Sequence, residues 1–227
     1  MAQNDYCVIG MGRFGTEVAN YLASEGKKVL IIDNEKRVIE RFRQEFNYAI
    51  IADATNREVL EEIGIWKINA VIVCVSNIET SATICYNLRE LDVKNVMARA
   101  KNNLHKKILN ILGIKYSVIP EVIVGKQLGF RAIYNVDTDI ININKKVILI
   151  NLVVTNEKLT DRPLESLDLR KNGVNIITIE RNENVIFPIT PQTCLNVGDY
   201  VSIVCEIGKV GEVVKIFTNA SKQLFTY

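Results

Sequence analysis

Short apolar runs alternate with helical patterns through the first 120 residues, and this alternation constrains the fold more than any other feature. The runs that predict strands are residues 6–10, 28–34, 48–53, 70–76, 95–100 and 116–120. The helices expected between them are residues 13–25, 35–46, 56–63, 78–91 and 103–112. Nearly continuous Val and Ile runs are typical of strands that are buried on both faces. The sequence therefore predicts a Rossmann-like, doubly wound α/β domain with a six-stranded parallel sheet.

The remaining chain predicts one further helix and then a smaller α+β module. Residues 121–135 have the pattern of an amphipathic helix that lies outside the sheet. After it we expect strands within 139–155, a short helix over 161–173, a hairpin over 174–188 that turns at 181–184, a strand within 190–206 and a closing helix over 208–218. Asp161 is expected to open the short helix, with Pro163 in its first turn. We place the domain boundary between residues 1–135 and 136–227, and a module of this size suits ligand sensing or assembly.

Composition and charge exclude several classes of function. The formal net charge is +2 and basic residues are scattered, so we expect no nucleic-acid partner. The five cysteines show no metal-ligand spacing, and Cys7 and Cys74 fall in apolar runs where free thiols are buried. No apolar run reaches the roughly 20 residues of a membrane helix, and no signal peptide is apparent. We therefore expect a cytoplasmic protein with reduced thiols.

A glycine pattern connects the first expected strand to the first expected helix. Gly10, Gly12 and Gly15 have the G-x-G-x-x-G spacing of a phosphate-binding turn, in the strand–turn–helix context that such a turn requires. The first glycine permits a tight turn, the second lets backbone N–H groups approach a pyrophosphate, and the third allows close packing of helix on strand. Asp33 ends the second strand, where an acid binds ribose hydroxyls and disfavours a 2′-phosphate. The pattern favours NAD or an adenine nucleotide; the alternative is a Rossmann fold that has lost its ligand.

One residue in this turn is unusual for its position. Arg13 falls in the first turn of the expected helix, where the helix dipole already presents partial positive charge. A cation there is unfavourable when the site is empty and is neutralised when an anion binds. Arg13 therefore indicates an anionic ligand.

Other polar residues follow the later strands, at the sheet edge where ligands bind in open α/β folds. Asp53, Ala54 and Thr55 follow the third strand, and this stretch could equally form a helix-capping turn. Ser76 and Asn77 end the fourth strand. Arg99 ends the fifth strand, where a surface ion pair is the alternative to a place in the crevice.

Several of these segments together resemble a known family. The stretches VIGMGRFG, IIDNE, IADAT, VIVCVSNIETS and NLHKKILNILGIKYSVIPE look like the amino-terminal domain of the RCK (regulator of K⁺ conductance, or TrkA-N) family. Within that family they are most similar to Ktr-type cytosolic subunits of bacterial potassium transporters. The stretch from RPLESLDLRKNG to NVGDYVSIV is similar, more loosely, to the carboxyl-terminal (TrkA-C) domain.

The resemblance implies roles for residues of the first domain. It implies that Arg13 contacts a nucleotide phosphate, that Asp33 binds ribose and that the turn of Asp53, Ala54 and Thr55 lines the adenosine pocket. Asn34 is an uncertain second ribose contact, because the segment after Asp33 is one residue shorter than in many relatives. The full expected binding set is Gly10, Gly12, Arg13, Phe14, Gly15, Asp33, Asn34, Asp53, Ala54, Thr55, Ser76, Asn77 and Arg99.

The resemblance also implies two further ligands. Glu121 matches a glutamate that takes part in divalent-cation binding at a dimer interface; the alternative is an ordinary acidic residue in a helix first turn. Arg170, with Ile176 and Ile177, matches a region that binds cyclic di-AMP between two subunits, although the local spacing is shortened. The alternative for Arg170 is a surface basic residue near a helix end.

For function, the resemblance implies a regulatory subunit that is not an enzyme. ATP or ADP binding would change the shape of an octameric ring of homodimers beneath a membrane-embedded potassium-translocating subunit, at the inner face of the cell membrane. The alternatives are an NAD(H)-binding oxidoreductase and a redox-sensing regulator. Against an oxidoreductase, the only histidine, His105, is expected to be a solvated residue of an outer helix, and no catalytic pairing is apparent.

Overall fold

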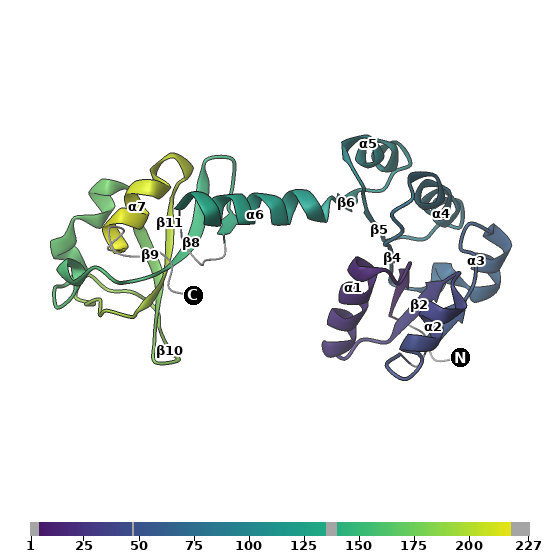
Figure 1. The fold of residues 1–227 in the computed structure, drawn as a ribbon, viewed down its shortest axis with the longest axis horizontal. Helices are drawn as coiled ribbons and strands as arrows, with labels where there is room; N and C mark the ends of the chain where they lie inside the picture. The colour runs from purple at the N-terminus through teal and green to yellow at the C-terminus, as the bar shows by residue number, and fades with distance from the viewer. Residues whose placement is uncertain (1–4, 47, 135–139, 219–227) are drawn as a thin grey trace. The chain divides into compact units, whose positions relative to one another are not determined.

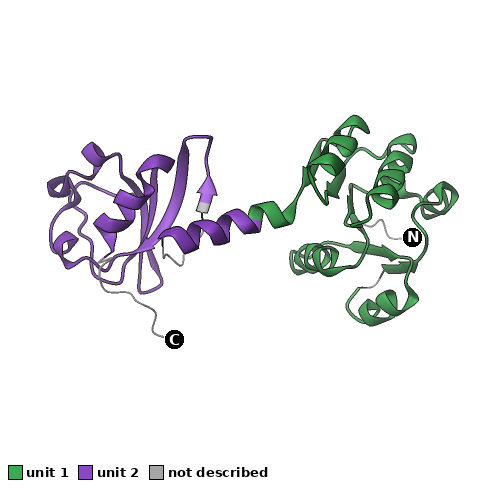
Figure 2. Cartoon of the chain, turned by 45° about the horizontal axis from the view of Figure 1, so that its top comes forward, with its two compact units in different colours: residues 1–123 green, residues 124–227 purple. Residues whose placement is uncertain are grey.

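The computed structural model describes residues 5–46, 48–134 and 140–218. The chain divides into two compact units, Met1–Ile123 and Val124–Tyr227, which Figure 2 colours separately. The two units are described one at a time. The domain boundary that we expected between residues 135 and 136 lies outside the described residues.

Unit 1 contains the expected parallel sheet. Its six strands are β1 (Tyr6–Ile9), β2 (Val29–Asp33), β3 (Tyr48–Ile51), β4 (Ala70–Val73), β5 (Val96–Arg99) and β6 (Tyr116–Val118). They pair in parallel in the order β3-β2-β1-β4-β5-β6, which is the order of a Rossmann fold. The predicted fold class of this domain is therefore confirmed, and the strand order reverses between β1 and β4, where such sheets bind ligands.

Helices cover both faces of this sheet (Figure 1). They are α1 (Arg13–Ser24), α2 (Lys36–Phe42), α3 (Arg57–Ile63), α4 (Ile78–Glu90) and α5 (Asn103–Ile111), with a short 3₁₀ helix η1 (Ile65–Lys67). Helices α1 and α2 share one hydrophobic core with Val8 and Ile31. Helices α3, α4 and α5 share the other with Cys7 and Ile9. Successive residues of β1 thus enter opposite cores, which explains why the strand is apolar without alternation.

Helix α6 (Pro120–Tyr134) follows β6 and begins in unit 1. The expected helix over this stretch is confirmed, and none of its residues, all of which are described, is buried. Large apolar side chains such as Leu128 and Ile133 are more than half exposed.

Unit 2 contains a five-stranded antiparallel sheet in the order β10-β9-β11-β8-β7. The strands are β7 (Ile140–Asn142), β8 (Val147–Val153), β9 (Asn175–Arg181), β10 (Asn184–Ile186) and β11 (Tyr200–Glu206). Unit 2 also contains the short 3₁₀ helices η2 (Glu157–Leu159) and η5 (Ile207–Lys209) and the helix α7 (Val210–Phe217). Val210, Val213, Val214 and Phe217 of α7 pack into the same core as alternate residues of β8 and β11. The predicted hairpin and closing helix are confirmed.

The helix expected over residues 161–173 is wrong. Two short 3₁₀ helices, η3 (Leu164–Leu167) and η4 (Leu169–Asn172), occupy this stretch instead. Asp168 between them has φ of +50°, which a right-handed helix cannot contain. Asp161 also has positive φ, and extended Pro163 caps η3 without lying inside it. The backbone therefore turns at Asp161 and at Asp168, where one continuous helix was expected.

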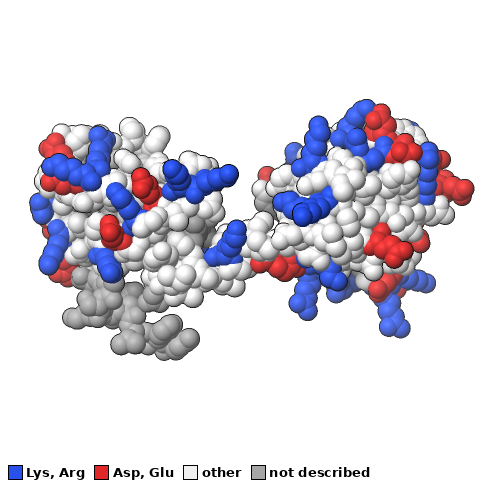
Figure 3. All heavy atoms as spheres, turned by 90° about the horizontal axis from the view of Figure 1, so that it is seen from above, with Lys and Arg blue, Asp and Glu red and all other residues white. Residues whose placement is uncertain are grey.

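One face of the surface carries charges of both signs. On the face of each unit drawn in Figure 3, Lys and Arg side chains are interspersed with Asp and Glu. Among the described residues, no helix is long and apolar enough to span a membrane.

Candidate functional site

The glycine turn after β1 is built as its spacing predicts. Gly10 has φ of +93°, a conformation that favours glycine. A side chain on Gly15 would place its Cβ 2.0 Å from the carbonyl oxygen of Gly10, so α1 can lie this close to the turn only because Gly15 has none. A Cβ on Gly12 would meet nothing within 4 Å, which leaves open space beside the turn. Arg13 then begins α1.

Asp33 organises this turn from the end of β2. The backbone N–H of Met11 donates to its Oδ2 at 2.8 Å, and the backbone N–H of Glu35 donates to its Oδ1 at 2.9 Å. One carboxylate thus joins the glycine turn to the segment that follows β2. Each carboxylate oxygen keeps a further lone pair with which it can accept a ligand hydroxyl.

A cavity of about 200 Å³ opens beside the glycine turn at the carboxyl edge of the sheet. Five of the expected binding residues line it, namely Gly10, Asp33, Asn34, Asp53 and Ala54. The sequence analysis missed the other lining residues, namely Ile9, Ile32, Ala52, Val75, Thr80 and Ile84. Asp33 and Asp53 are the acidic residues of this lining, and apolar side chains form most of the rest. Such a cavity can accept a flat apolar ring together with hydroxyl donors.

The turn after β3 is held by its own side chains. The backbone N–H of Thr55 donates to Asp53 Oδ1 at 2.9 Å, and the Thr55 hydroxyl donates to the same oxygen at 2.7 Å. These hydrogen bonds hold the pKa of the Asp53 carboxyl below its ordinary value, so it is charged at neutral pH. Asn56, and neither Asp53 nor Thr55, is the N-cap of the helix that follows, and within this turn Asp53 and Ala54 line the cavity whereas Thr55 does not.

Residues 76 and 77 lie at the start of α4 and do not line the cavity. Asn77 is the N-cap of α4: its Oδ1 accepts from the backbone N–H of Thr80 at 3.0 Å. Ser76 is exposed. Asn77 therefore positions the helix turn that brings Thr80 to the cavity.

Arg13 and Phe14 extend the site along the first turn of α1. Arg13 is exposed, and within the described residues it has no hydrogen-bond or ion-pair partner. No acidic residue lies in that first turn. Phe14 is partly buried against the core under α1. An unpaired guanidinium at a helix N-terminus is a favourable place for an anion.

Arg99 links the end of β5 to two other elements. It forms an ion pair with Glu121 in the first turn of α6, and its guanidinium carbon lies 5.9 Å from the centre of the Phe14 ring. The surface ion pair that we considered for Arg99 is therefore present. The Glu121 carboxyl has a lowered pKa because it accepts from its own backbone N–H and from Arg99. Within the described part of one chain, no cluster of three or more His, Cys, Asp or Glu residues could hold a metal ion.

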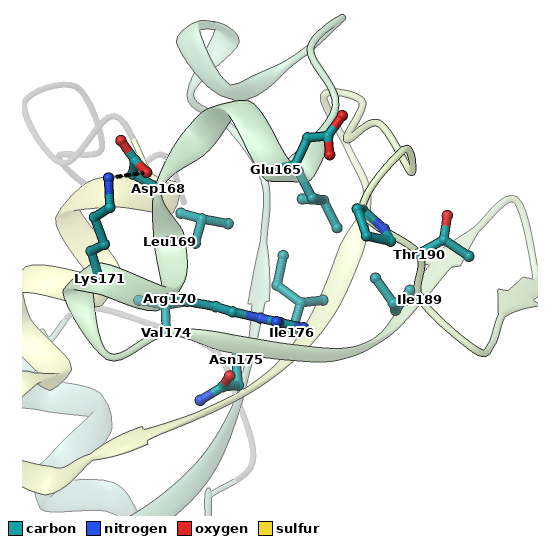
Figure 4. Close-up of a pocket in the computed structure, with 12 residues that line it drawn as sticks. Glu165, Asp168, Leu169, Arg170, Lys171, Val174, Asn175, Ile176, Ile189 and Thr190 are labelled. Atoms are coloured by element: carbon teal, nitrogen blue, oxygen red, sulfur yellow. Dashed lines mark ion pairs between the residues drawn. The ribbon is translucent and has the colours of Figure 1, made fainter.

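A second and larger cavity, of about 420 Å³, lies within unit 2 (Figure 4). Arg170 of η4 and Ile176 of β9 line it, with Ile189 and Thr190 from the segment after β10. Ile177 does not line the cavity. The pairing of β9 with β11 shifts by one residue at this point, and Ile177 is the extra residue of the bulge. Ile177 is 37% exposed, whereas Ile176 packs against the core of unit 2.

The expectation for His105 is wrong. It lies in α5 with an exposed fraction of 0%, and its Nδ1 accepts from the backbone N–H of Lys101 at 3.1 Å. Burial lowers its pKa, so it stays neutral at pH 7. Cys7 and Cys74 are buried as expected, and burial raises the pKa of Cys74 to about 12. Neither His105 nor these two cysteines line the cavity beside the glycine turn, so they provide no reactive group there.

The chain has relatives of similar sequence. The chain is 38% identical over 227 residues to an uncharacterized Mycoplasma pneumoniae homolog of MG323, covering 99% of this chain and 98% of that one. It is 31% identical over 186 residues to the Ktr system potassium uptake protein C of Bacillus subtilis, covering 81% of this chain and 84% of that one. Both alignments span most of the two proteins they compare.

Solved structures share the fold. A GsuK channel bound to NAD superposes with a TM-score of 0.67 at 15% identity over 96% of this chain. GsuK bound to ADP superposes with a TM-score of 0.53 at 18% identity over 58% of it. This chain spans 40% and 35% of those two chains, respectively. At these sequence identities, the similarity to the two structures concerns the fold alone.

Family models cover both units. The TrkA-N domain matches residues 6–120, which contain the glycine turn, the cavity beside it and Arg99. The TrkA-C domain matches residues 149–218, which contain the second cavity. The chain belongs to the RCK family, with a TrkA-N and a TrkA-C domain, and its relatives include proteins named as Ktr system potassium uptake proteins.

Proposed function

We propose that this chain is a cytoplasmic, nucleotide-sensing regulatory subunit of a potassium-uptake system, and that ATP and ADP are the nucleotides it senses. The observation that carries the proposal is the combination at the carboxyl edge of the sheet. An unpaired Arg13 begins α1, and a cavity lined by Asp33 and Asp53 lies beside the glycine turn. A cation at the turn and acids in the cavity suit a ligand with phosphates at one end and hydroxyls at the other.

The proposed signal is the number of phosphates. A diphosphate and a triphosphate share adenine and ribose, so the cavity binds both alike. They differ in charge and in reach along the first turn of α1, where Arg13 lies. A ligand that binds two conformations with different affinity shifts the equilibrium between them.

The ion-conducting part of the proposed system is a separate membrane-embedded potassium-translocating subunit. We propose that homodimers of this chain assemble into an octameric ring at the inner face of the membrane, as the Ktr resemblance implies. Light scattering on the purified chain tests this part: the mass should be eight times 25.6 kDa. A monomer at micromolar concentration would contradict the ring.

NAD or NADH is the alternative ligand of the same site, since a fold relative carries NAD. Native mass spectrometry of the purified chain distinguishes the two, because a retained dinucleotide differs in mass from ATP or ADP. Binding of ATP and ADP in preference to NAD supports the proposal. Binding of NAD alone, with hydride transfer to a substrate, would favour the oxidoreductase alternative.

We also propose that the cavity of unit 2 binds cyclic di-AMP. A volume of about 420 Å³ suits part of a small ligand, and Arg170 offers a cation for a phosphodiester at its wall (Figure 4). Arg170→Ala should weaken cyclic di-AMP binding at least tenfold by calorimetry. Lys158→Ala, an exposed cation of the same unit outside the cavity lining, is the matched control. Equal affinity in both variants would remove Arg170 from the site.

A divalent cation at Glu121 is the last part of the proposal. Arg99 pairs with one oxygen of this carboxylate, and the other oxygen would bind the cation. Glu121→Gln should abolish any Mg²⁺ or Ca²⁺ dependence of ATP binding, measured by calorimetry with and without chelator. Unchanged cation dependence would place the cation elsewhere.

A further inference from the structure

A buried asparagine on α4 contacts the turn that follows β3. Asn87 is 8% exposed, and its Nδ2 donates to the carbonyl oxygen of Thr55 at 2.8 Å. The two residues are 32 positions apart, so the hydrogen bond joins separate elements. A buried amide is costly unless it is hydrogen-bonded, and an apolar residue is the ordinary occupant of such a position.

Asn87 lies on the face of α4 that forms the cavity wall. Thr80, Ile84 and Asn87 are spaced four and then three residues apart, which places them along one side of a helix. Thr80 and Ile84 line the cavity. Asn87 continues this face for one more turn and reaches the turn after β3, whose residues Asp53 and Ala54 line the same cavity.

The carbonyl of Thr55 needs a partner from another element. Helix α3 has Asn56 as its N-cap, and the carbonyl of Asn56 accepts the first helical hydrogen bond, from the backbone N–H of Leu60. Thr55 precedes the cap, so its own carbonyl lies outside the helical ladder. Its N–H and hydroxyl are both taken by Asp53. Asn87 satisfies the backbone group that the turn itself leaves open.

We propose that Asn87 is a positioning residue of the nucleotide site, which fixes the turn of Asp53, Ala54 and Thr55 before a ligand binds. The inference rests on the proposed nucleotide-binding function and deepens it. A turn that is already ordered loses less conformational freedom on binding, which raises affinity without a new contact. Asp53 and Ala54 of this turn line the cavity and Arg13 does not. Fixing the turn should therefore raise the affinity for the adenosine part, which all adenine nucleotides share.

The test is Asn87→Leu in the full chain, with affinities for AMP, ADP and ATP measured by calorimetry. Leucine has a similar size and removes the N–H donor, so all three affinities should fall by the same factor, about tenfold. Asn95→Leu is the matched control. The Nδ2 of Asn95, which precedes β5, donates at 2.9 Å to the carbonyl oxygen of Asn69, which precedes β4. This hydrogen bond lies at the amino ends of the strands, at the edge of the sheet opposite the cavity. Loss of this Asn95 hydrogen bond should leave the affinities for AMP, ADP and ATP unchanged.

Two results would overturn the inference while nucleotide binding stands: unchanged affinities in Asn87→Leu, or a loss that grows with phosphate number. Absence of binding by the unaltered chain would overturn the proposed function, and this inference with it. If Asn87→Leu does not fold, amide hydrogen exchange of the unaltered chain decides. Slow exchange of the Asn87 side-chain amide protons without nucleotide, measured by NMR, supports a turn fixed in advance, and slow exchange that arises only with ATP contradicts it.

Discussion

Replacing Asp33 by alanine should destabilise unit 1 in the absence of any ligand. The carboxylate accepts hydrogen bonds from the backbone N–H groups of Met11 and Glu35, at 2.8 and 2.9 Å. Met11 is only 2% exposed, so water has little access to replace the lost acceptor there. Glu35 is exposed, and water can take over its hydrogen bond.

The expected loss of stability follows from the different exposure of the Met11 and Glu35 N–H groups. A hydrogen bond to a charged group contributes about 1.5–3 kcal/mol, and an unsatisfied buried donor costs about 1–3 kcal/mol. Since only the Met11 N–H is left buried, Asp33→Ala should lower the free energy of unfolding of unit 1 by about 2–3 kcal/mol. The glycine turn should loosen at the same time, because this bond fixes it to the end of β2.

The chain offers a probe and a control for this measurement. Trp66, the only tryptophan, lies in η1 of unit 1 and is 45% exposed, so its fluorescence in urea reports the unfolding of that unit. Asp5→Ala removes a similar bond, from the backbone N–H of Lys28 at 3.1 Å, at an exposed position before β1. It should cost less than about 1 kcal/mol. A loss for Asp33→Ala no larger than that for Asp5→Ala would refute the structural role of Asp33.

The remaining predictions concern the helix contact, the ribose and unit 2. Gly15→Ala should abolish nucleotide binding and lower the urea midpoint of unit 1, because its Cβ would overlap the carbonyl of Gly10; normal binding would contradict the close packing. Asp33→Asn should weaken AMP, ADP, ATP and NAD alike in calorimetry, and unchanged affinities would remove Asp33 from the ribose site. Burial opposes ionisation of Asp199, but hydrogen bonds from Arg181 and a backbone N–H outweigh it and lower the pKa. The stabilisation of unit 2 by the ionised Asp199 carboxylate is therefore complete above the unfolded pKa of about 3.9 and is lost as the pH falls through the folded pKa. Unit 2 should lose stability below about pH 4, as measured by circular dichroism. Asp199→Asn should be less stable at pH 7, and its stability should fall less steeply as the pH is lowered. Equal slopes of stability against pH in the two proteins would refute this role of Asp199.

Much of unit 1 could be predicted because its signals are local. A buried parallel strand needs a continuous apolar run, and a phosphate turn needs glycines at fixed spacing, so both are visible in a short window. The ends of α3 carry local signals too, since Asn56 is a favoured N-cap residue and Gly64 a favoured residue at a left-handed helix end. The cavity wall on α4 could not be predicted, because Thr80 reaches the cavity, and Asn87 reaches the turn after β3, through packing between distant elements.

Other errors have physical causes as well. His105 is flanked by polar and basic residues, but it shares a helix face with Leu109, and that four-residue spacing was the available signal of burial. The helical pattern over 161–173 was interrupted by backbone conformation, since Asp168 adopts positive φ. Aspartate tolerates that region better than most residues, so the residue type was compatible with either outcome.

The central claim is that Arg13 makes the site respond to phosphate number. The direct test measures adenosine, AMP, ADP and ATP binding to the unaltered chain and to Arg13→Ala. Arg37→Ala, an exposed arginine in the first turn of α2, is the matched control. The account predicts a loss of about tenfold for ATP, a smaller loss for ADP and none for adenosine, with the control unchanged. An equal loss for all four ligands, or no loss for ATP, would contradict it.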